Sequence, residues 1–376
     1  MLAGSCKRWP MPTTTAAVLR SPDAPFALET LDLDEPRPGE ALVGLVASGM
    51  CHTDLSMREP FRPTPYPVVL GHEGSGRIEA VGPGVTDLEV GQPVVLSYTS
   101  CGRCRFCLRG EPNYCQSIWA LNTPCCRPDG STALADEAGP VGSHFFGQSS
   151  FATHAVVPRS SIVPVTDDAP LELLGPLGCG VQTGAGAVLN VLGPEPGDSL
   201  VVFGCGAVGL SAVLAATVAG CDPIIGVDIH DSRLETAARL GATHTINGGH
   251  DDLVAALLDV SPGGVDYSFD AAGAPSTLEA AVECLAHRGT CGFVAAGGPD
   301  HTVKISPRHL LSGRTITGIL EGDSVSPVFI PQLIELHRRG RFPFDELITT
   351  YPLADINEAE AASRSGDVFK PVLLMP

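Results

Sequence analysis

The sequence predicts an α/β protein in which a β-rich domain is interrupted by a domain built on a doubly wound parallel sheet. Residues 16–95 consist of short apolar runs separated by Pro and Gly, which is typical of an all-β unit with tight turns. In the middle of the chain, strand and helix patterns alternate, which indicates a parallel sheet covered by helices. The alternation then stops, and we expect the tail to return to the first domain. The predicted domains are residues 11–181 with 324–376, and residues 182–323.

The size and charge of the chain limit its function. A single core stops growing at about 250–300 residues, so 376 residues favour two domains. A net charge of −19 repels nucleic acids and anionic membranes, and we expect neither as a partner. The first ten residues, "MLAGSCKRWP", lack the apolar run of a signal peptide and are expected to lie outside the fold. Thirteen cysteines without such a signal indicate a reducing compartment, the cytoplasm.

The elements of the predicted parallel sheet follow one another regularly. A buried strand "SLVVFG" precedes a small-residue helix over 207–219, and "PIIGVDI" and "SRLETAARLG" repeat the pattern. The alternation continues through "DDLVAALLDV", "VDYSFD", "STLEAAVECLAHRG" and "TCGFVAAGG". In the tail, "LADINEAEAASRSGDVFKPVLLMP" predicts a helix and a final strand, whereas residues 116–150 are expected to form a long irregular loop.

One short segment, "CGRCRFCLRGEPNYC", contains Cys101, Cys104, Cys107 and Cys115. Disulfides, an iron-sulfur cluster and a zinc ion are the candidates for four thiols so close together. A reducing compartment disfavours disulfides, and the fourth cysteine follows too late for the bacterial ferredoxin spacing. Four cysteines in one lobe suit tetrahedral zinc with no open position for substrate, so we expect a structural zinc site.

The segment "VVFGCGAVGL" carries Gly204, Gly206 and Gly209 in the GxGxxG spacing, after a strand and at the start of a helix. This arrangement lets the backbone approach a pyrophosphate at the helix N-terminus. Asp228 ends the next strand, where a carboxylate can bind both ribose hydroxyls and repel a 2′-phosphate. The pattern therefore favours NAD over NADP.

A catalytic zinc needs three protein ligands and one open position, and single candidates for it lie far apart in the sequence. These are Cys51 in "SGMCHTDLS", His72 in "VLGHEGSG" and Cys179 in "GPLGCGVQTG". Taken singly, each is more often an ordinary core residue than a metal ligand.

Taken together and in this order, these segments resemble the zinc-containing medium-chain alcohol dehydrogenases over residues 14–376. The resemblance implies a GroES-like catalytic domain interrupted by a Rossmann domain. It makes Cys51, His72 and Cys179 the ligands of a catalytic zinc, so that two zinc ions are bound per chain. It also implies that zinc lowers the pKa of an alcohol, whose alkoxide then transfers hydride to NAD.

The resemblance assigns roles to further residues near this zinc. Glu73 is expected to approach the metal transiently, and Asp54 to orient His72. Thr53 is expected to take the alcohol proton. His52 and Lys370 are expected to contact the cofactor pyrophosphate.

Two more residues are expected near the cofactor, and one relay position departs from the family. Thr183 is expected beside the nicotinamide and Arg233 near the adenosine ribose. Ser56 stands where many members of the family have a His that passes the proton to solvent, and serine does not titrate near pH 7. We therefore expect the proton to leave through the cofactor ribose and water, or through His52.

Within the family, "SGMCHTDL", "SYTSCGRC" and "FFGQSSFATHAVV" resemble aryl and allylic alcohol dehydrogenases of the benzyl alcohol type. The expected reaction is reversible oxidation of a bulky hydrophobic primary alcohol to its aldehyde. One alternative is oxidation of S-hydroxymethyl adducts of a small thiol, which needs a cation for the anionic carrier, with Arg127 as candidate. Another is a non-catalytic NAD-binding redox sensor.

The long loop and the remaining cysteines give two further expectations. The loop resembles dimeric relatives, so a homodimer is expected, with a tetramer as the alternative. Cys125 and Cys126 in this loop are candidates for a substrate contact or a redox role. The other cysteines are expected to be structural: Cys6, Cys205, Cys221, Cys284 and Cys291.

Overall fold

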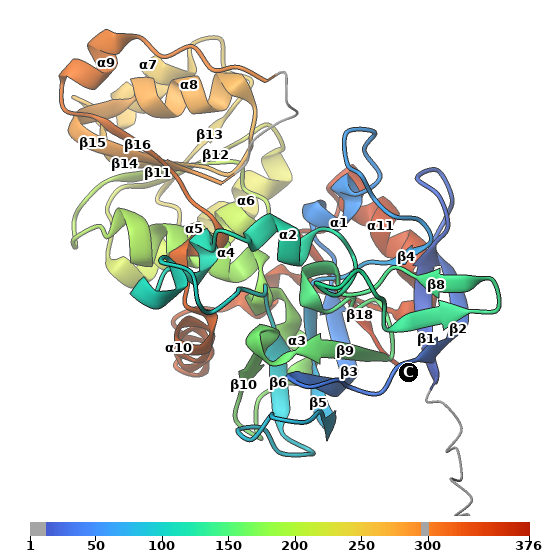
Figure 1. Ribbon diagram of the computed structural model, residues 1–376. Helices are drawn as coiled ribbons and strands as arrows, with labels where there is room; N and C mark the ends of the chain where they lie inside the picture. Colours follow the sequence, from blue (N-terminus) through green and yellow to red (C-terminus); the bar gives the residue numbers. More distant parts are fainter. Residues whose placement is uncertain (1–12, 295–300) are drawn as a thin grey trace, which may run out of the picture. The chain divides into compact units, whose positions relative to one another are not determined.

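The computed structural model describes residues 13–294 and 301–376, so the expected N-terminal extension lies outside the described residues. The chain divides into two compact units (Figure 1). Of the described residues, the first unit comprises 13–105, Cys115–Gly178 and Thr349–Pro376. The second comprises Phe106–Tyr114 and Cys179–Ile348.

The first unit is rich in short strands, as its Pro- and Gly-punctuated sequence predicts. Its elements are β1 Thr13–Leu19, β2 Ala27–Leu33, β3 Glu40–Gly49, α1 His52–Ser56, β4 Val68–Val69, β5 Glu73–Val81, β6 Pro93–Leu96, α2 Ile118–Asn122, β7 Leu134–Asp136, β8 Gly139–Val141, β9 His154–Pro158, β10 Ile162–Pro164, α3 Leu171–Leu174, β17 Ile348–Pro352, α11 Ile356–Ser365 and β18 Lys370–Leu374. One sheet has the order β4-β1-β2-β7-β8. The other has the order β10-β6-β5-β3-β18-β17, with β9 also paired to β3.

The antiparallel pairing of β3 with β5 places the candidate ligands. Gly49, the last residue of β3, pairs with Glu73, the first residue of β5. Cys51 follows the end of β3 and His72 precedes the start of β5, so both leave the sheet at the same place. Tertiary pairing therefore brings together two residues that are distant in sequence.

The second unit is a parallel sheet with helices between its strands. Its elements are α4 Gly180–Gly186, a π-helical turn Ala187–Leu192, β11 Leu200–Phe203, α5 Ala207–Ala219, β12 Ile224–Asp228, α6 Asp231–Arg239, β13 His244–Asn247, α7 Leu253–Val260, β14 Val265–Asp270, α8 Pro275–Glu283, β15 Leu285–Phe293, α9 Pro307–Leu311, β16 Thr315–Gly318 and α10 Ser326–Arg338. The strand order is β13-β12-β11-β14-β15-β16, and every pair is parallel. This is the 3-2-1-4-5-6 order of a dinucleotide-binding fold, in which ligands bind beyond the carboxyl ends of the strands.

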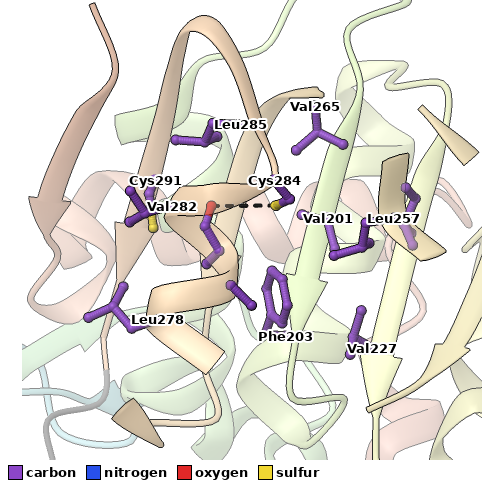
Figure 2. Close-up of a cluster of buried hydrophobic side chains, with 13 residues drawn as sticks. Val201, Phe203, Val227, Leu257, Val265, Leu278, Val282, Cys284, Leu285 and Cys291 are labelled. Atoms are coloured by element: carbon purple, nitrogen blue, oxygen red, sulfur yellow. Dashed lines mark hydrogen bonds between the residues drawn. The ribbon is translucent and has the colours of Figure 1, made fainter. Parts of the chain in front are cut away.

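Alternation along β11 divides the core of this unit between the two faces of the sheet. Val201 and Phe203 pack with Leu257 of α7 and Leu278 of α8 in the cluster of Figure 2. Val202 points the other way, toward Gly209 at the start of α5. A central strand buried on both faces explains why "SLVVFG" is an unbroken apolar run.

The structure differs from the predicted organisation in three places. Residues 324–348 belong to the second unit rather than the first, because α10 buries an apolar stripe there and the Ser326 hydroxyl donates to Gln182 Oε1 (3.1 Å). The expected irregular loop 116–150 contains a hairpin, β7 with β8, which extends a sheet by pairing with β2. The segment "STLEAAVECLAHRG" is a helix in the predicted alternation, whereas in the structure α8 ends at Glu283 and β15 begins at Leu285.

Candidate metal and dinucleotide sites

The three dispersed candidates for a catalytic zinc come together with Glu73. The ligand atoms of Cys51, His72, Glu73 and Cys179 all lie within 4.8 Å of one another. Cys179 is joined to Gly178, whose carbonyl accepts a hydrogen bond from the Ser97 hydroxyl (2.7 Å). Two thiols and one imidazole form a donor set that suits zinc.

Asp54, on the short helix α1, ties this group together. Its Oδ1 lies 2.8 Å from His72 Nδ1 and accepts the Gly71 N–H (3.0 Å). Its Oδ2 accepts the Cys51 N–H (2.9 Å). One fully buried carboxylate therefore orients two candidate ligands, and the structure brings Asp54 to His72 as expected.

The surroundings of the His72 ring fit a bound cation. With Nδ1 directed at Asp54, Nε2 is left as the atom available to a metal, and it is buried without a hydrogen-bond partner. Burial lowers the pKa of His72, but the charge of Asp54 and the Cys51 thiol outweigh burial and raise it well above the ordinary value. The Asp54 carboxylate and the Cys51 thiol would also favour Zn²⁺ at this position, since imidazole and thiolate are preferred zinc ligands.

Two aromatic rings enclose His72. The Phe145 ring centroid lies 5.5 Å away, edge to face, and the Phe146 centroid lies 4.7 Å away. Both phenylalanines belong to the segment 144–149, where His144, Phe146 and Ser149 have φ values of 63°, 50° and 54°. Backbone strain of this kind persists only where surrounding contacts enforce it.

Lys370 has a different partner from the expected one. Its Nζ lies 2.9 Å from both carboxylate oxygens of Glu73, and both side chains are buried. Burial raises the pKa of Glu73, while the Lys370 ammonium opposes that rise. The structure thus places Lys370 on the carboxylate next to His72, whereas the pyrophosphate contact stays a prediction.

The predicted relay residues lie on or beside α1. Thr53 Oγ1 is 3.8 Å from Cys51 Sγ, at the candidate metal group. The Ser56 hydroxyl donates to the Thr53 backbone carbonyl (2.8 Å) rather than to the Thr53 hydroxyl. His52 is exposed.

The four-cysteine lobe also brings its thiols together. The sulfur atoms of Cys101, Cys104, Cys107 and Cys115 lie within 4.8 Å of one another. Cys104 Sγ and Cys115 Sγ are 4.0 Å apart, near the roughly 3.8 Å separation in a tetrahedral zinc site. Backbone N–H groups of Cys101 and Ser117 point at Cys115 Sγ (3.3 and 3.4 Å). A backbone hydrogen bond from Arg103 lowers the pKa of Cys101, which favours the thiolate that binds metal.

The glycine loop of the second unit has the shape of a phosphate cradle. Gly204 has a φ of 85°, and an added Cβ there would lie 2.9 Å from the Ala272 nitrogen. An added Cβ at Gly206, by contrast, would meet no atom within 4 Å, so this part of the loop is open to a ligand. Gly209 packs directly against the loop at the start of α5. These features match the separate roles of the three glycines.

Asp228 ends β12 beside this loop. Its Oδ2 accepts the Cys205 N–H (2.8 Å) and lies 3.6 Å from Arg233 Nη1. Arg233 Nε is buried without a hydrogen-bond partner. Thr183 lies on α4, where its N–H donates to the Cys179 carbonyl (2.9 Å).

Arg127 is not the free cation that the thiol-adduct alternative requires, and that expectation is wrong. It is 4% exposed, and its guanidinium binds Glu40 (2.7 Å) and Asp34 (2.9 Å). Because both carboxylates neutralise it inside the protein, it offers little to an anionic carrier.

The remaining cysteines of the described chain are free thiols. Cys125 is buried, and burial raises its pKa to about 12, which opposes reactivity. Burial likewise raises the pKa of Cys126. Cys6 lies outside the described residues.

Several contacts of the candidate ligands could not be found by pattern. Gln148 binds the backbone on both sides of Glu73, and Glu321 Oε1 lies 3.8 Å from Cys179 Sγ. The one available signal was the pair of aromatic residues in "FFGQSSF", which gave no indication of the ring that they contact.

Among the described helices, none is both long and apolar enough to cross a membrane.

Known families and proteins match both units. The alcohol dehydrogenase GroES-like domain matches residues 37–167, and the zinc-binding dehydrogenase family matches residues 207–337. Geraniol dehydrogenase of Castellaniella defragrans is 46% identical over 362 residues, covering 96% of this chain and 97% of that protein. S-(hydroxymethyl)glutathione dehydrogenase of Paracoccus denitrificans is 35% identical over 375 residues, covering 96% and 99%.

A solved structure agrees with these matches. The crystal structure of benzyl alcohol dehydrogenase from Acinetobacter calcoaceticus has a TM-score of 0.94 and 46% identity, covering 97% of this chain and 100% of that one. The two family matches, the sequence identity over nearly the whole chain and the two candidate metal groups all point to the same family. The chain belongs to the zinc-dependent medium-chain alcohol dehydrogenases, enzymes that act on small-molecule alcohols.

Proposed function

We propose that this enzyme catalyses the reversible, NAD-dependent oxidation of a bulky hydrophobic primary alcohol, aryl or allylic, to its aldehyde. The observation that carries the chemistry is the cluster of two thiols and an imidazole whose buried Nε2 has no hydrogen-bond partner. Two relatives at 46% identity are named for geraniol and benzyl alcohol, and this supports the substrate class. Phe145 and Phe146 beside His72 also favour an apolar substrate.

The residues of the two cysteine groups and of α1 have separate proposed roles in zinc binding and proton transfer. Cys51, His72 and Cys179 hold the catalytic zinc, and the four-cysteine lobe holds a second, structural zinc. Zinc and NAD supply a Lewis acid that acidifies the alcohol and an acceptor for its hydride. Thr53 takes the alcohol proton, because its hydroxyl lies beside Cys51. Asp54 keeps the His72 ring oriented toward the metal.

The proton then needs a route to solvent. The Ser56 hydroxyl is occupied by the Thr53 backbone carbonyl, so in this arrangement it does not extend a chain from the Thr53 hydroxyl. Exposed His52 on α1 is the chain's own candidate to pass the proton to solvent, and the ribose of a bound cofactor with water would offer the alternative route.

The cofactor is proposed to be NAD, bound through the glycine loop with Asp228 on the ribose and Arg233 and Thr183 nearby. The Asp228 carboxylate disfavours NADP because a 2′-phosphate would lie against a negative charge. Replacement of Asp228 by Ser should therefore raise the KM for NAD and lower that for NADP, each measured by steady-state kinetics at saturating alcohol.

Oligomeric state and compartment complete the proposal. We propose a homodimer, from the long loop after the cysteine lobe, and a cytoplasmic location, from the thirteen cysteines. Sedimentation velocity and fractionation of expressing cells measure these two properties directly.

A substrate panel tests the proposed reaction. NADH absorbance is followed with benzyl alcohol, cinnamyl alcohol, geraniol, ethanol, and formaldehyde with or without added thiol, each repeated after chelation. We expect chelator-sensitive turnover that is fastest with the aryl or allylic alcohols. Turnover restricted to formaldehyde plus thiol would assign the enzyme to the thiol adducts. Absence of turnover in protein that binds zinc and NAD would favour a redox sensor.

A further inference from the structure

Gln148 is a buried side chain that contacts the backbone at the start of β5, next to His72. It is 2% exposed, and its Nε2 donates to the His72 carbonyl (2.8 Å). Its Oε1 accepts the Gly74 N–H (3.0 Å). The carboxamide therefore forms hydrogen bonds with the backbone on both sides of Glu73.

These contacts lie at the start of β5, before its register with β6 begins. On one edge of β5, β3 pairs as far as Glu73, opposite Gly49. On the other edge, the register with β6 ends at Ser75, opposite Val95. Beyond that pair the register between β5 and β6 is not continued, and the Ser97 N–H faces the opposite edge of β6, where it donates to Ser161 next to β10 (2.9 Å).

The Gln148 carboxamide takes the place of the β6 partner that the chain lacks before Ser75. It supplies one acceptor and one donor to β5, as a peptide group of a neighbouring strand would. Its Nε2 also reaches the Ser97 carbonyl (3.4 Å), and so links the start of β5 to the residue that follows β6. Gly74 permits the close approach, since an added Cβ would lie 2.9 Å from Ser150 Cβ and 3.1 Å from Gln148 Oε1.

The strained segment that carries Gln148 is also hydrogen-bonded to the chain just before β5. Ser149 Oγ donates to the Val69 carbonyl (2.6 Å) and accepts the Phe145 N–H (3.0 Å). The Ser150 N–H donates to the Gly71 carbonyl (2.9 Å). Strain at three non-glycine residues is thus maintained by bonds to residues 69–74, the stretch that presents His72.

We infer that Gln148 is a positioning residue for the catalytic metal: its carboxamide replaces a missing strand beside residues 72–74 and fixes the backbone that presents His72 and Glu73. The inference rests on the proposed role of His72 as a zinc ligand. Asp54 orients the imidazole ring, whereas Gln148 fixes the main chain from which the ring projects. A metal ligand is pre-organised only when both the orientation of its ring and the position of its backbone are fixed.

The test uses Gln148→Met, which keeps the side-chain length and removes all three hydrogen bonds. Zinc affinity is measured by competition with a colorimetric chelator, and the ligand-field absorption is recorded after cobalt replaces zinc. Cys51→Ser identifies which metal equivalent belongs to the catalytic group. We expect about tenfold to hundredfold weaker binding of that equivalent and a changed cobalt spectrum. Gln148→Asn keeps a carboxamide on a shorter arm, should give a smaller loss, and serves if Gln148→Met does not fold.

Asn122 offers a matched control in the same unit. It is 1% exposed, and its carboxamide accepts the Thr99 N–H (2.9 Å) and donates to the Thr99 carbonyl (2.9 Å). Asn122→Leu should lower the melting temperature without weakening the catalytic equivalent.

Three outcomes decide between the inference and its premise. Unchanged affinity and spectrum in folded Gln148→Met would overturn the inference, as would an equal loss of the catalytic equivalent in Asn122→Leu. If Cys51→Ser itself retained full metal and turnover, the proposed function would fail, and that result is distinct from either of the others.

Discussion

The four-cysteine lobe and the mixed cysteine-histidine group use similar ligands but are assembled in opposite ways. The lobe takes all four thiols from residues 101–115, a single excursion of the chain. The mixed group takes its proposed ligands from the end of β3, the start of β5 and the residue after Gly178. A local site depends on its own loop, whereas a dispersed site depends on the packing of the whole domain.

The residues that support the two groups differ in the same way. Backbone N–H groups within and next to the lobe point at its sulfur atoms, as Ser117 does at Cys115. The mixed group is supported by side chains from other elements, Asp54 on α1 and Gln148 in the strained segment. Substitution of supporting residues such as Asp54 and Gln148 should therefore weaken metal binding by the mixed group. Metal binding by the lobe should hardly change, because the N–H groups that point at its sulfur atoms lie within or next to the lobe itself.

The largest expected effect follows from removing a ligand of the mixed group. Cys179→Ala takes away one thiolate and with it the Lewis acid, which is worth several kcal/mol to the reaction. We expect turnover to fall at least about a thousandfold. The melting temperature should change little, because the change removes one sulfur atom and leaves the Asp54 and Gln148 hydrogen bonds to the surrounding chain in place. A matching loss of stability in thermal melts would mean that the mixed group is structural after all.

A smaller loss is expected when only the support of the mixed group changes. Asp54→Asn keeps the side-chain shape but weakens the contact with His72 and removes a buried negative charge. Turnover and zinc affinity should each fall about tenfold to hundredfold. Added zinc should partly restore turnover, because the ligands are intact. Absence of any effect on zinc affinity would show that ring orientation does not limit binding.

The smallest effect on turnover, and the largest on stability, is expected in the lobe. Cys104→Ser should release one zinc equivalent and cost at least about 3 kcal/mol, well below the roughly 10–16 kcal/mol by which zinc stabilises isolated zinc-finger peptides. For a unit of this size the melting temperature should fall by about 6–12 °C. Turnover per folded molecule should stay within about threefold. Loss of both zinc equivalents, measured by metal analysis, would show that the two sites are coupled.

The sequence predicted what is encoded locally. The lobe ligands lie within one short segment, and the glycine loop lies between a strand and a helix that are adjacent in sequence. Apolar periodicity was sufficient for β11, α5, β12 and α6, because each buries its own face against its chain neighbours. The dispersed candidate ligands Cys51, His72 and Cys179 could be singled out only by a family resemblance, since no spacing relates them.

What the sequence by itself determined, then, is the alternation of elements, the four-thiol segment and the dinucleotide loop. Tertiary structure alone decided that Lys370 pairs with Glu73, that Arg127 is neutralised by Glu40 and Asp34, and that Gln148 completes the edge of β5. The physical reason is the range of the interactions. Hydrogen bonds within a turn follow from neighbouring residues, whereas a buried charge or amide takes whichever partner the packed chain brings within about 3 Å of it.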